Sequence, residues 1–276
     1  MKRPAYFDIH SHCNDSRFNE DRERIIGDML DEDIWTITVG TNRNMSKLAA
    51  EMTLLGDGVF ASVGVHPVDN PDEGFDAAFY SDLLLKYPKI VAVGECGLDY
   101  FRIAGDGLAE KKRQSDLFEQ QIEFAVQNKL PLMIHVRGAK GAEIFAHNEL
   151  IDLVTSKKRE YGDALRGNIH FFSGDIVIAK KYFELDFTIS ITGVITFTHD
   201  YDEVIRYAPA NLIMAETDAP YVAPVPYRGK RNVPLYIKEV SDQIAAIRKQ
   251  EKEALRNLLV DNALRFFAVS EKIAKQ

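Results

Sequence analysis

The stretch AYFDIHSH, residues 5–12, joins a short apolar run to one aspartate and two histidines. Side chains alternate across a β-strand, so Asp8, His10 and His12 are expected on the same side of it. One carboxylate and two imidazoles can then point together from a strand end, and neutral histidine is the commonest metal ligand in proteins. The alternative, that these are polar residues of an ordinary loop, stays open on this stretch alone.

Seven further apolar or β-branched runs follow, and longer segments with helical spacing separate them. This alternation is typical of parallel βα units. Eight strands with helices between them favour a closed (β/α)₈ TIM barrel over an open sheet, so the predicted class is α/β. The predicted strands are residues 5–10, 35–39, 59–65, 90–94, 132–136, 167–171, 187–191 and 212–215.

The length of 276 residues suits one TIM barrel, and no linker or shift in composition divides the chain. We therefore expect a single domain over residues 1–276. Residues 110–128 predict an amphipathic helix, and residues 233–248 and 252–267 predict two more that complete the outer layer of the barrel. Cys13 and Cys96 are predicted to be small buried hydrophobes rather than a disulfide.

Composition limits the compartment and the partners. No stretch approaches the roughly 20 apolar residues of a membrane span, and the N-terminal residues contain no apolar segment, so we expect a soluble, cytoplasmic monomer. The net charge is −8, from 34 Lys and Arg against 42 Asp and Glu, which argues against a protein that coats nucleic acid. It leaves open an enzyme with a local basic cleft, because such contacts act within a Debye length.

Polar side chains gather where the predicted strands end. Five of the seven histidines lie at strand ends on one face of the predicted barrel, whereas structural histidines would be scattered over helices and loops. His147 and His199 lie in helical or loop sequence and are predicted to be surface or capping residues. The residues at strand ends are His10, His12, His66, Glu95, His135, His170 and Asp218.

These residue types suit divalent metal ions. Imidazole nitrogens and carboxylate oxygens bind zinc, magnesium or manganese, and a carboxylate such as that of Glu95 can bridge two ions. Two adjacent metals would lower the pKa of a bound water, producing hydroxide near neutral pH. Asp218 could orient that water and accept its proton. The sequence therefore predicts a hydrolase with two divalent ions, in which Glu95 and Asp218 are catalytic.

Six motifs that contain these residues resemble the TatD family of metal-dependent deoxyribonucleases. They stand in the family's order, between residue 6 and about residue 232. The motifs are Asp8-Ile-His10-Ser-His12, Val63-Gly-Val-His66-Pro67, Gly94-Glu95-Cys-Gly-Leu-Asp99-Tyr100, Ile134-His135-Val-Arg137, His170-Phe-Phe-Ser173-Gly174 and Glu216-Thr-Asp218-Ala-Pro220-Tyr221.

The resemblance implies a binuclear site. In it His10, His12 and Asp218 hold one ion, His135 and His170 hold the other, and Glu95 bridges them. It also implies a deoxyribonuclease that binds DNA, often a 3′-to-5′ exonuclease on single strands, with Asp218 as the proton acceptor. The segment after His135 departs from the family pattern, since Gly138 stands where members commonly have Asp. Support from that carboxylate is therefore missing or comes from elsewhere.

Several side chains could contact the substrate. Arg137 follows His135 by two positions and should share its side of the strand. Three cations lie in the loop after Asp218, where a solvated charge run is the alternative to phosphate binding. His66 would contact phosphate or support a metal ligand, although a lone histidine could equally belong to the core. The candidate substrate-binding residues are His66, Arg137, Arg228, Lys230 and Arg231, with Tyr100, Phe101 and Tyr221 as candidate stacking surfaces.

Three functions remain in competition. The leading one is two-metal hydrolysis of DNA phosphodiesters. The same metals polarise a carbonyl as readily, so an ester or amide hydrolase, such as a deacylase of aminoacylated RNA or of a small metabolite, is the alternative. A catalytically silent barrel is the third, and missing ligands would have been its signature.

Overall fold

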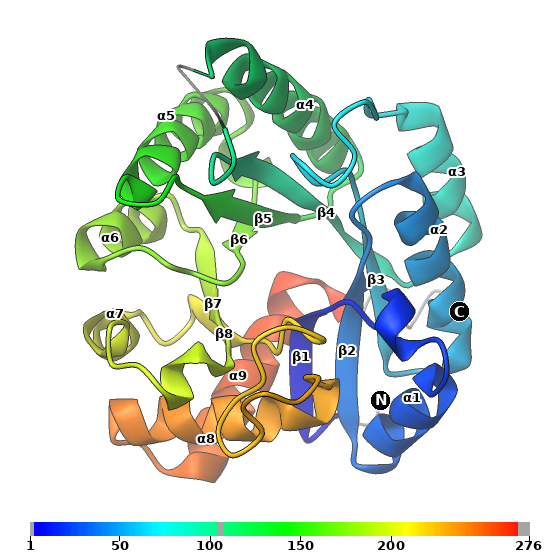
Figure 1. Ribbon diagram of the computed structural model, residues 1–276, viewed down its shortest axis with the longest axis vertical. Helices are drawn as coiled ribbons and strands as arrows, with labels where there is room; N and C mark the ends of the chain where they lie inside the picture. The colour runs from blue at the N-terminus through cyan, green and yellow to red at the C-terminus, as the bar shows by residue number, and fades with distance from the viewer. Residues whose placement is uncertain (1–2, 104–106, 270–276) are drawn as a thin grey trace.

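The computed structural model describes residues 3–103 and 107–269, and eight parallel strands form a barrel within them (Figure 1). Each strand pairs with its neighbours in sequence, in the order β1-β2-β3-β4-β5-β6-β7-β8, which confirms the predicted (β/α)₈ fold. Residues 1–2, 104–106 and 270–276 of the predicted single domain lie outside the described residues. The strands are β1 (Tyr6–Ser11), β2 (Ile34–Val39), β3 (Val59–Val63), β4 (Ile90–Asp99), β5 (Leu132–Arg137), β6 (Gly167–Ile169), β7 (Thr188–Ile191) and β8 (Ile213–Ala215).

Helices surround the barrel, and short polar side chains begin several of them. Asn42 accepts a hydrogen bond from the backbone N–H of Met45 at the start of α2, and Asp175 accepts one from Ile178 at the start of α6. No helix in residues 3–103 and 107–269 has the length and apolar character needed to cross a membrane. The helices are α1 (Arg22–Asp31), α2 (Arg43–Met52), α3 (Ala77–Lys86), α4 (Leu108–Gln127), α5 (Glu143–Tyr161), α6 (Ile176–Glu184), α7 (Asp202–Tyr207), α8 (Ile237–Arg248) and α9 (Lys252–Phe266).

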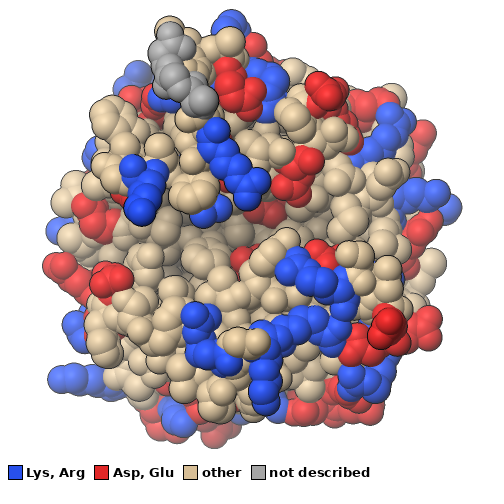
Figure 2. Space-filling view, in the orientation of Figure 1, with Lys and Arg blue, Asp and Glu red and all other residues tan. Residues whose placement is uncertain are grey.

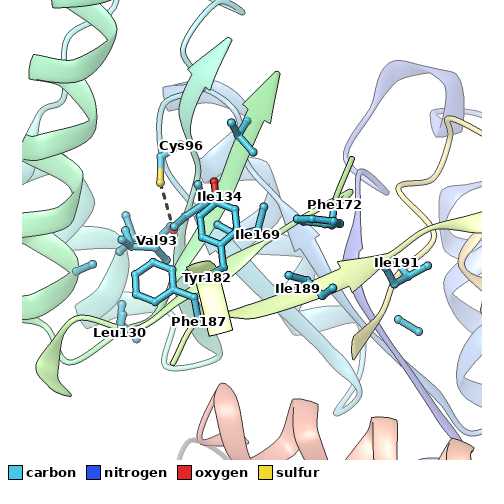
Figure 3. Packing of buried hydrophobic residues seen from close by; sticks show 14 of the residues in the cluster. Val93, Cys96, Leu130, Ile134, Ile169, Phe172, Tyr182, Phe187, Ile189 and Ile191 are labelled. Carbon is cyan, nitrogen blue, oxygen red and sulfur yellow. Dashed lines mark hydrogen bonds between the residues drawn. The ribbon is translucent and has the colours of Figure 1, made fainter. Parts of the chain in front are cut away.

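The largest part of the core lies between the strands and the helices. Figure 3 shows part of this cluster, which includes isoleucines of β5, β6 and β7 and the fully buried ring of Tyr182 from α6. Both cysteines are free and buried, as predicted. Burial raises the pKa of the Cys13 thiol to about 12, so this thiol is neutral and acts as a small apolar group.

The two C-terminal helices occupy different places. Helix α8 packs against α7 and belongs to the outer layer, as predicted, whereas α9 contacts β1 and β8 and lies behind the barrel in Figure 1. Val260, Ala263 and Phe267 share one buried cluster with the second residue of each of six strands, so α9 covers the end of the barrel where strands begin. The prediction that both helices join the outer layer is therefore wrong for α9. The six strand residues are Phe7, Trp35, Phe60, Val91, Met133 and Met214.

The seam between β8 and β1 closes at the opposite end. The backbone N–H of Asp218 donates to the carbonyl of His10 (2.9 Å), and the N–H of His12 donates to the carbonyl of Ala219 (2.6 Å). These bonds lie beyond the last residue of β8. Barrel closure itself therefore brings the segment of His10 and His12 against the segment of Asp218.

Strand β4 continues to Asp99, although the apolar pattern predicts an end at residue 94. Pairing with β5 resumes after a register shift between Val93 and Cys96, which is the irregularity that carries Glu95. Gly94 has φ +143°, and a Cβ there would lie 2.4 Å from the carbonyl oxygen of Met133, so glycine is required. Gly94 and Gly97 interrupt the apolar run, so the apolar pattern does not predict the second half of this strand.

The position of His147 also differs from the sequence prediction. The sequence predicts a surface or capping residue here, but His147 lies in α5 with only 1% of its surface exposed. Its Nδ1 atom is 3.1 Å from the Tyr182 hydroxyl. Burial lowers the pKa of His147 to about 4. A helical residue can face inward or outward, and only the packing of α5 on the barrel decides which. His199, by contrast, is exposed as predicted.

We expect His147 to make the fold sensitive to acid. In the unfolded chain its pKa is about 6.5, so between pH 6.5 and 4 the unfolded state binds a proton that the folded state does not. The stabilisation is complete above pH 6.5 and falls by up to about 3 kcal/mol as the pH approaches 4. His147→Gln keeps an amide beside Tyr182 but does not titrate. Urea unfolding at several pH values should show that the free energy of unfolding depends less on pH in the variant than in the parent protein. The same pH dependence in both proteins would contradict this prediction.

Candidate metal centre

The carboxyl-terminal ends of the strands surround a cavity of about 720 Å³. Figure 2 shows this face hollowed near its centre, with Lys and Arg side chains on two opposite sides of the hollow. The residues that line it include His12, His66, Glu95, Asp99, Phe101, Arg102, His135, Arg137, His170, Asp218 and Tyr221. The cavity therefore collects most of the polar residues that the sequence placed at strand ends.

The carboxylate of Glu95 lies between two groups of imidazoles. Its Oε1 atom is 2.8 Å from His170 Nε2 and 3.0 Å from His135 Nδ1. Its Oε2 atom is 3.6 Å from His12 Nε2 and 3.7 Å from His10 Nε2. One oxygen thus faces each group, which is the arrangement a bridging carboxylate needs.

The first group consists of His10, His12 and Asp218. The Nε2 atoms of the two histidines are 3.1 Å apart, and Asp218 Oδ1 is 3.7 Å from His10 Nε2 and 3.4 Å from His12 Nε2. His12 Nδ1 lies 3.2 Å from the carbonyl oxygen of Val39, so that nitrogen carries the proton and Nε2 keeps its lone pair. Converging lone pairs and a carboxylate are a donor set that fits a divalent cation.

The second group consists of Glu95, His135 and His170. The Nδ1 atom of His135 is 3.4 Å from Nε2 of His170, and both nitrogens face the same oxygen of Glu95. The other nitrogen of His135, Nε2, is 3.0 Å from Asp99 Oδ2. His135 would therefore bind a cation through Nδ1 while Asp99 holds its ring from behind.

Two carboxylates that sequence analysis left without a role support this group. Asp99 orients His135, and the fully buried Glu216 lies 3.4 Å from Nδ1 of His170. Glu216 also accepts hydrogen bonds from the Phe171 backbone (2.6 Å) and from Ser190 (2.6 Å), which fix its position. Both residues stand two or four positions from a predicted ligand on the same strand or strand end, so the alternation of side chains was the signal that could have found them.

Asp8 does not join the metal ligands, although the spacing suggested that its carboxylate could point with the two imidazoles. It is fully buried and accepts hydrogen bonds from the backbone N–H (2.8 Å) and the hydroxyl (2.6 Å) of Thr217. Burial raises its pKa well above the ordinary value, against these hydrogen bonds. Asp8 therefore joins β1 to the segment after β8 below the metal centre.

Gly138 is explained by its surroundings. A Cβ at this position would lie 2.3 Å from the backbone oxygen of Glu143, so an aspartate could not stand there without a shift of the backbone. His135 has a carboxylate partner in Asp99, on the neighbouring strand.

The buried carboxylates and imidazoles shift one another's pKa values. Burial raises the pKa of Glu95, but the charges of His170 and His66 outweigh it and hold that pKa well below the ordinary value. Burial likewise lowers the pKa of His170, but Glu95 and Glu216 outweigh it and raise that pKa well above the ordinary value. A proton on His170 thus balances the negative charge of the buried carboxylates, and a divalent cation could take over that role.

The predicted substrate contacts separate into two sets. His66 and Arg137 line the cavity, and His66 Nε2 is 3.6 Å from Glu95 Oε1 while its Nδ1 is 3.1 Å from Asp69. The three cations of the loop after Asp218 are absent from the described residues that line the cavity.

Two of the three loop cations contact other residues. Arg231 forms two hydrogen bonds with Asp21 (2.6 and 2.9 Å), and the Arg228 guanidinium lies 3.8 Å from the centre of the Phe197 ring. Lys230 is exposed. The position of Arg231 in the sequence does not indicate that it forms an ion pair with Asp21, which lies just before α1.

We expect Asp99→Asn to weaken metal binding while the fold is kept. Asparagine has nearly the same shape, but it removes the negative charge that holds the ring of His135. Loss of such support typically costs roughly 10- to 100-fold in metal affinity. Competition with a chromogenic chelator measures the effect, with Asp76→Asn at the start of α3 as control, because asparagine also begins helices well. Equal affinities for Asp99→Asn and the parent protein would show that Asp99 does not support the site.

Relatives of this chain are described as metal-dependent hydrolases. The uncharacterized metal-dependent hydrolase YabD of Bacillus subtilis is 33% identical over 267 residues, which are 96% of this chain and 99% of YabD. The uncharacterized metal-dependent hydrolase YcfH of Escherichia coli is 31% identical over 215 residues, 77% of this chain and 75% of YcfH.

Solved structures share the fold. YJJV, a TatD homolog from Escherichia coli, superimposes with a TM-score of 0.82 at 23% identity over 96% of this chain and 98% of its own. A TatD family hydrolase from Entamoeba histolytica gives 0.78 at 19% identity, over 96% and 99%. The family model described as TatD related DNase matches residues 7–268. The chain therefore belongs to the TatD-related DNase family of metal-dependent hydrolases.

Proposed function

We propose that this protein is a deoxyribonuclease that hydrolyses DNA phosphodiester bonds with two divalent metal ions. The observation that carries the proposal is the position of Glu95, whose two carboxylate oxygens face two separate groups of ligands. Two cations about one shared carboxylate suit an in-line displacement at phosphorus, where attacking and leaving oxygens both need positive charge.

The chain supplies a complete set of ligands for such ions. His10, His12 and Asp218 would hold one, His135 and His170 the other, and Glu95 would contact both. Magnesium, manganese and zinc all accept nitrogen and carboxylate oxygen in this combination. When bound, the ions supply Lewis acidity to the reacting water and to the phosphoryl group.

Asp218 is the residue placed to move the proton. Its Oδ1 atom faces His10 and His12, which leaves the second carboxylate oxygen to accept a proton from the attacking water. The residue has φ +53°, an uncommon conformation for aspartate, and its backbone N–H is bonded to the carbonyl of His10. The closing seam of the barrel thus holds this carboxylate at the cavity.

Local cations rather than the overall charge would hold the DNA. The net charge of −8 repels a polyanion at long range, but Arg102 and Arg137 line the cavity and can contact phosphates beside the metal centre. The resemblance to TatD nucleases supports removal of nucleotides from single-stranded ends in the 3′-to-5′ direction. The same ligands could serve an ester or amide hydrolase, such as a deacylase of aminoacylated RNA or of a small metabolite.

Hydrolysis of end-labelled single-stranded DNA tests the proposal. The metal-stripped protein should be inactive, and adding Mg²⁺, Mn²⁺ or Zn²⁺ should restore a ladder of products that shortens from the 3′ end. Labels at the 5′ and the 3′ end in separate reactions give the direction. An oligonucleotide that stays intact with every metal, together with hydrolysis of an aminoacyl ester, would replace the nuclease by the deacylase.

Glu95→Gln should lower turnover by roughly 100-fold or more, because the amide keeps the volume of the side chain but loses the charge that both cations share. Metal content by atomic emission should fall along with the rate, while circular dichroism and the melting temperature report an intact fold. Glu119→Gln on the surface of α4, whose carboxylate contacts Lys157, is the matched control and should behave as the parent protein. Full activity of Glu95→Gln with a single bound metal would show that Glu95 is not a bridge.

A further inference from the structure

Phe101 is an exposed aromatic ring at the edge of the metal centre. It follows β4, lines the cavity, and has 41% of its surface exposed, whereas aromatic side chains usually bury most of theirs. The guanidinium of Arg137 lies 3.7 Å from its ring centre. Its backbone N–H donates to Asp99 Oδ1 (2.9 Å), the same carboxylate whose Oδ2 holds His135. The backbone of Phe101 is therefore bonded to the carboxylate that orients His135.

Tyr221 repeats this arrangement beside the first group of ligands. It follows β8, lines the same cavity, and is 45% exposed. The guanidinium of Arg17 lies 4.2 Å from its ring centre, and Asp15 holds that guanidinium with bonds of 2.9 and 2.8 Å. The N–H of Tyr221 donates to the carbonyl of Asp218 (2.8 Å), and its ring centre is 6.0 Å from that of His12.

The two rings stand on opposite sides of the site. Strands β4 and β8 are four places apart in the eight-stranded order, so the segments that follow them rise from opposite walls of the barrel (Figure 1). The same cavity is lined by five of the six candidate metal ligands, namely His12, Glu95, His135, His170 and Asp218. In each pair an arginine covers one part of the ring and leaves aromatic surface exposed to the cavity. Arg137 also adds positive charge beside the cavity, whereas the charge of Arg17 is balanced by Asp15.

We propose that Phe101 with Arg137, and Tyr221 with Arg17, form two base-stacking subsites that hold the nucleotides on either side of the scissile phosphate. The inference rests on the proposed nuclease function and specifies its substrate. Unpaired bases stack on aromatic rings with little regard to base identity, and arginine contacts the adjoining phosphates. A paired base is already stacked within its duplex, so these subsites select single strands and frayed ends.

The proposal predicts which part of the substrate each ring recognises. Phe101→Leu and Tyr221→Leu keep apolar volume but remove the aromatic face. Each should lower kcat/KM on a single-stranded oligonucleotide about 5- to 100-fold, mainly through KM, since stacking on one base contributes that much. For the parent protein, removing one base beside the cleaved bond should lower kcat/KM by a similar factor. For the variant that lacks the ring which would stack on that base, the same abasic strand should cause little further loss of kcat/KM.

Tyr207→Leu is the matched control. Tyr207 is 51% exposed and has the Lys180 ammonium 4.8 Å from its ring centre, but it lies at the end of α7 and is not among the described residues that line the cavity. Its kcat/KM on both oligonucleotides should equal that of the parent protein. Melting temperatures of all three variants exclude a general loss of structure.

A binding measurement separates this inference from the nuclease proposal. Fluorescence anisotropy gives the affinity of the metal-loaded protein for a labelled phosphorothioate oligothymidylate, which resists hydrolysis, and for an abasic strand of the same length. Tighter binding of the strand with bases, lost in Phe101→Leu and in Tyr221→Leu, supports the subsites even if the parent protein cleaves no DNA. Equal affinities for both strands, or variants that bind and cleave as the parent does, would overturn the subsites while any measured nuclease activity still stands.

Discussion

The carboxylate of Glu95, buried among imidazoles from three strand ends, is the contact on which the architecture of the site depends. An ionised carboxylate in the interior costs several kcal/mol unless opposite charge compensates it. The protein brings that charge from β1, β5 and β6, which requires the barrel to close and β4 to break its register at Glu95. Divalent cations between these groups would supply such compensation in place of protons.

Much of the barrel interior maintains this arrangement. Asp8 joins β1 to the segment after β8 through Thr217, while Asp99 and Glu216 hold the rings of His135 and His170 from behind. At the other end, residues of α9 share one buried cluster with residues from six strands. One end of the barrel is therefore sealed by apolar contacts, and the end with the ligands stays open. This arrangement is typical of TIM barrels, in which the residues that stabilise the fold and the residues of the active site lie at opposite ends.

Substrate choice depends on a different layer of the molecule. The ligands would serve a phosphoryl or a carbonyl group, so the groups around them must select the substrate. Phe101 and Tyr221 lie beside the ligands with arginines against their rings, whereas Arg228 and Arg231 contact the scaffold. A cation in a loop after a ligand is therefore weak evidence for phosphate binding until its own partners are known.

The sequence by itself determined the eight strands, the TIM-barrel class and the set of residues at the strand ends. Hydrophobic alternation is a local property, and strand ends in a parallel barrel always meet on one face, so these features need no knowledge of packing. Family motifs added the likeness to TatD nucleases. Tertiary structure alone decided that β4 continues through its glycines, that α9 covers the base of the barrel and that His147 is buried. It also decided that Asp8 bonds to Thr217 and that His135 offers Nδ1, because the direction of a side chain depends on register and on partners distant in sequence.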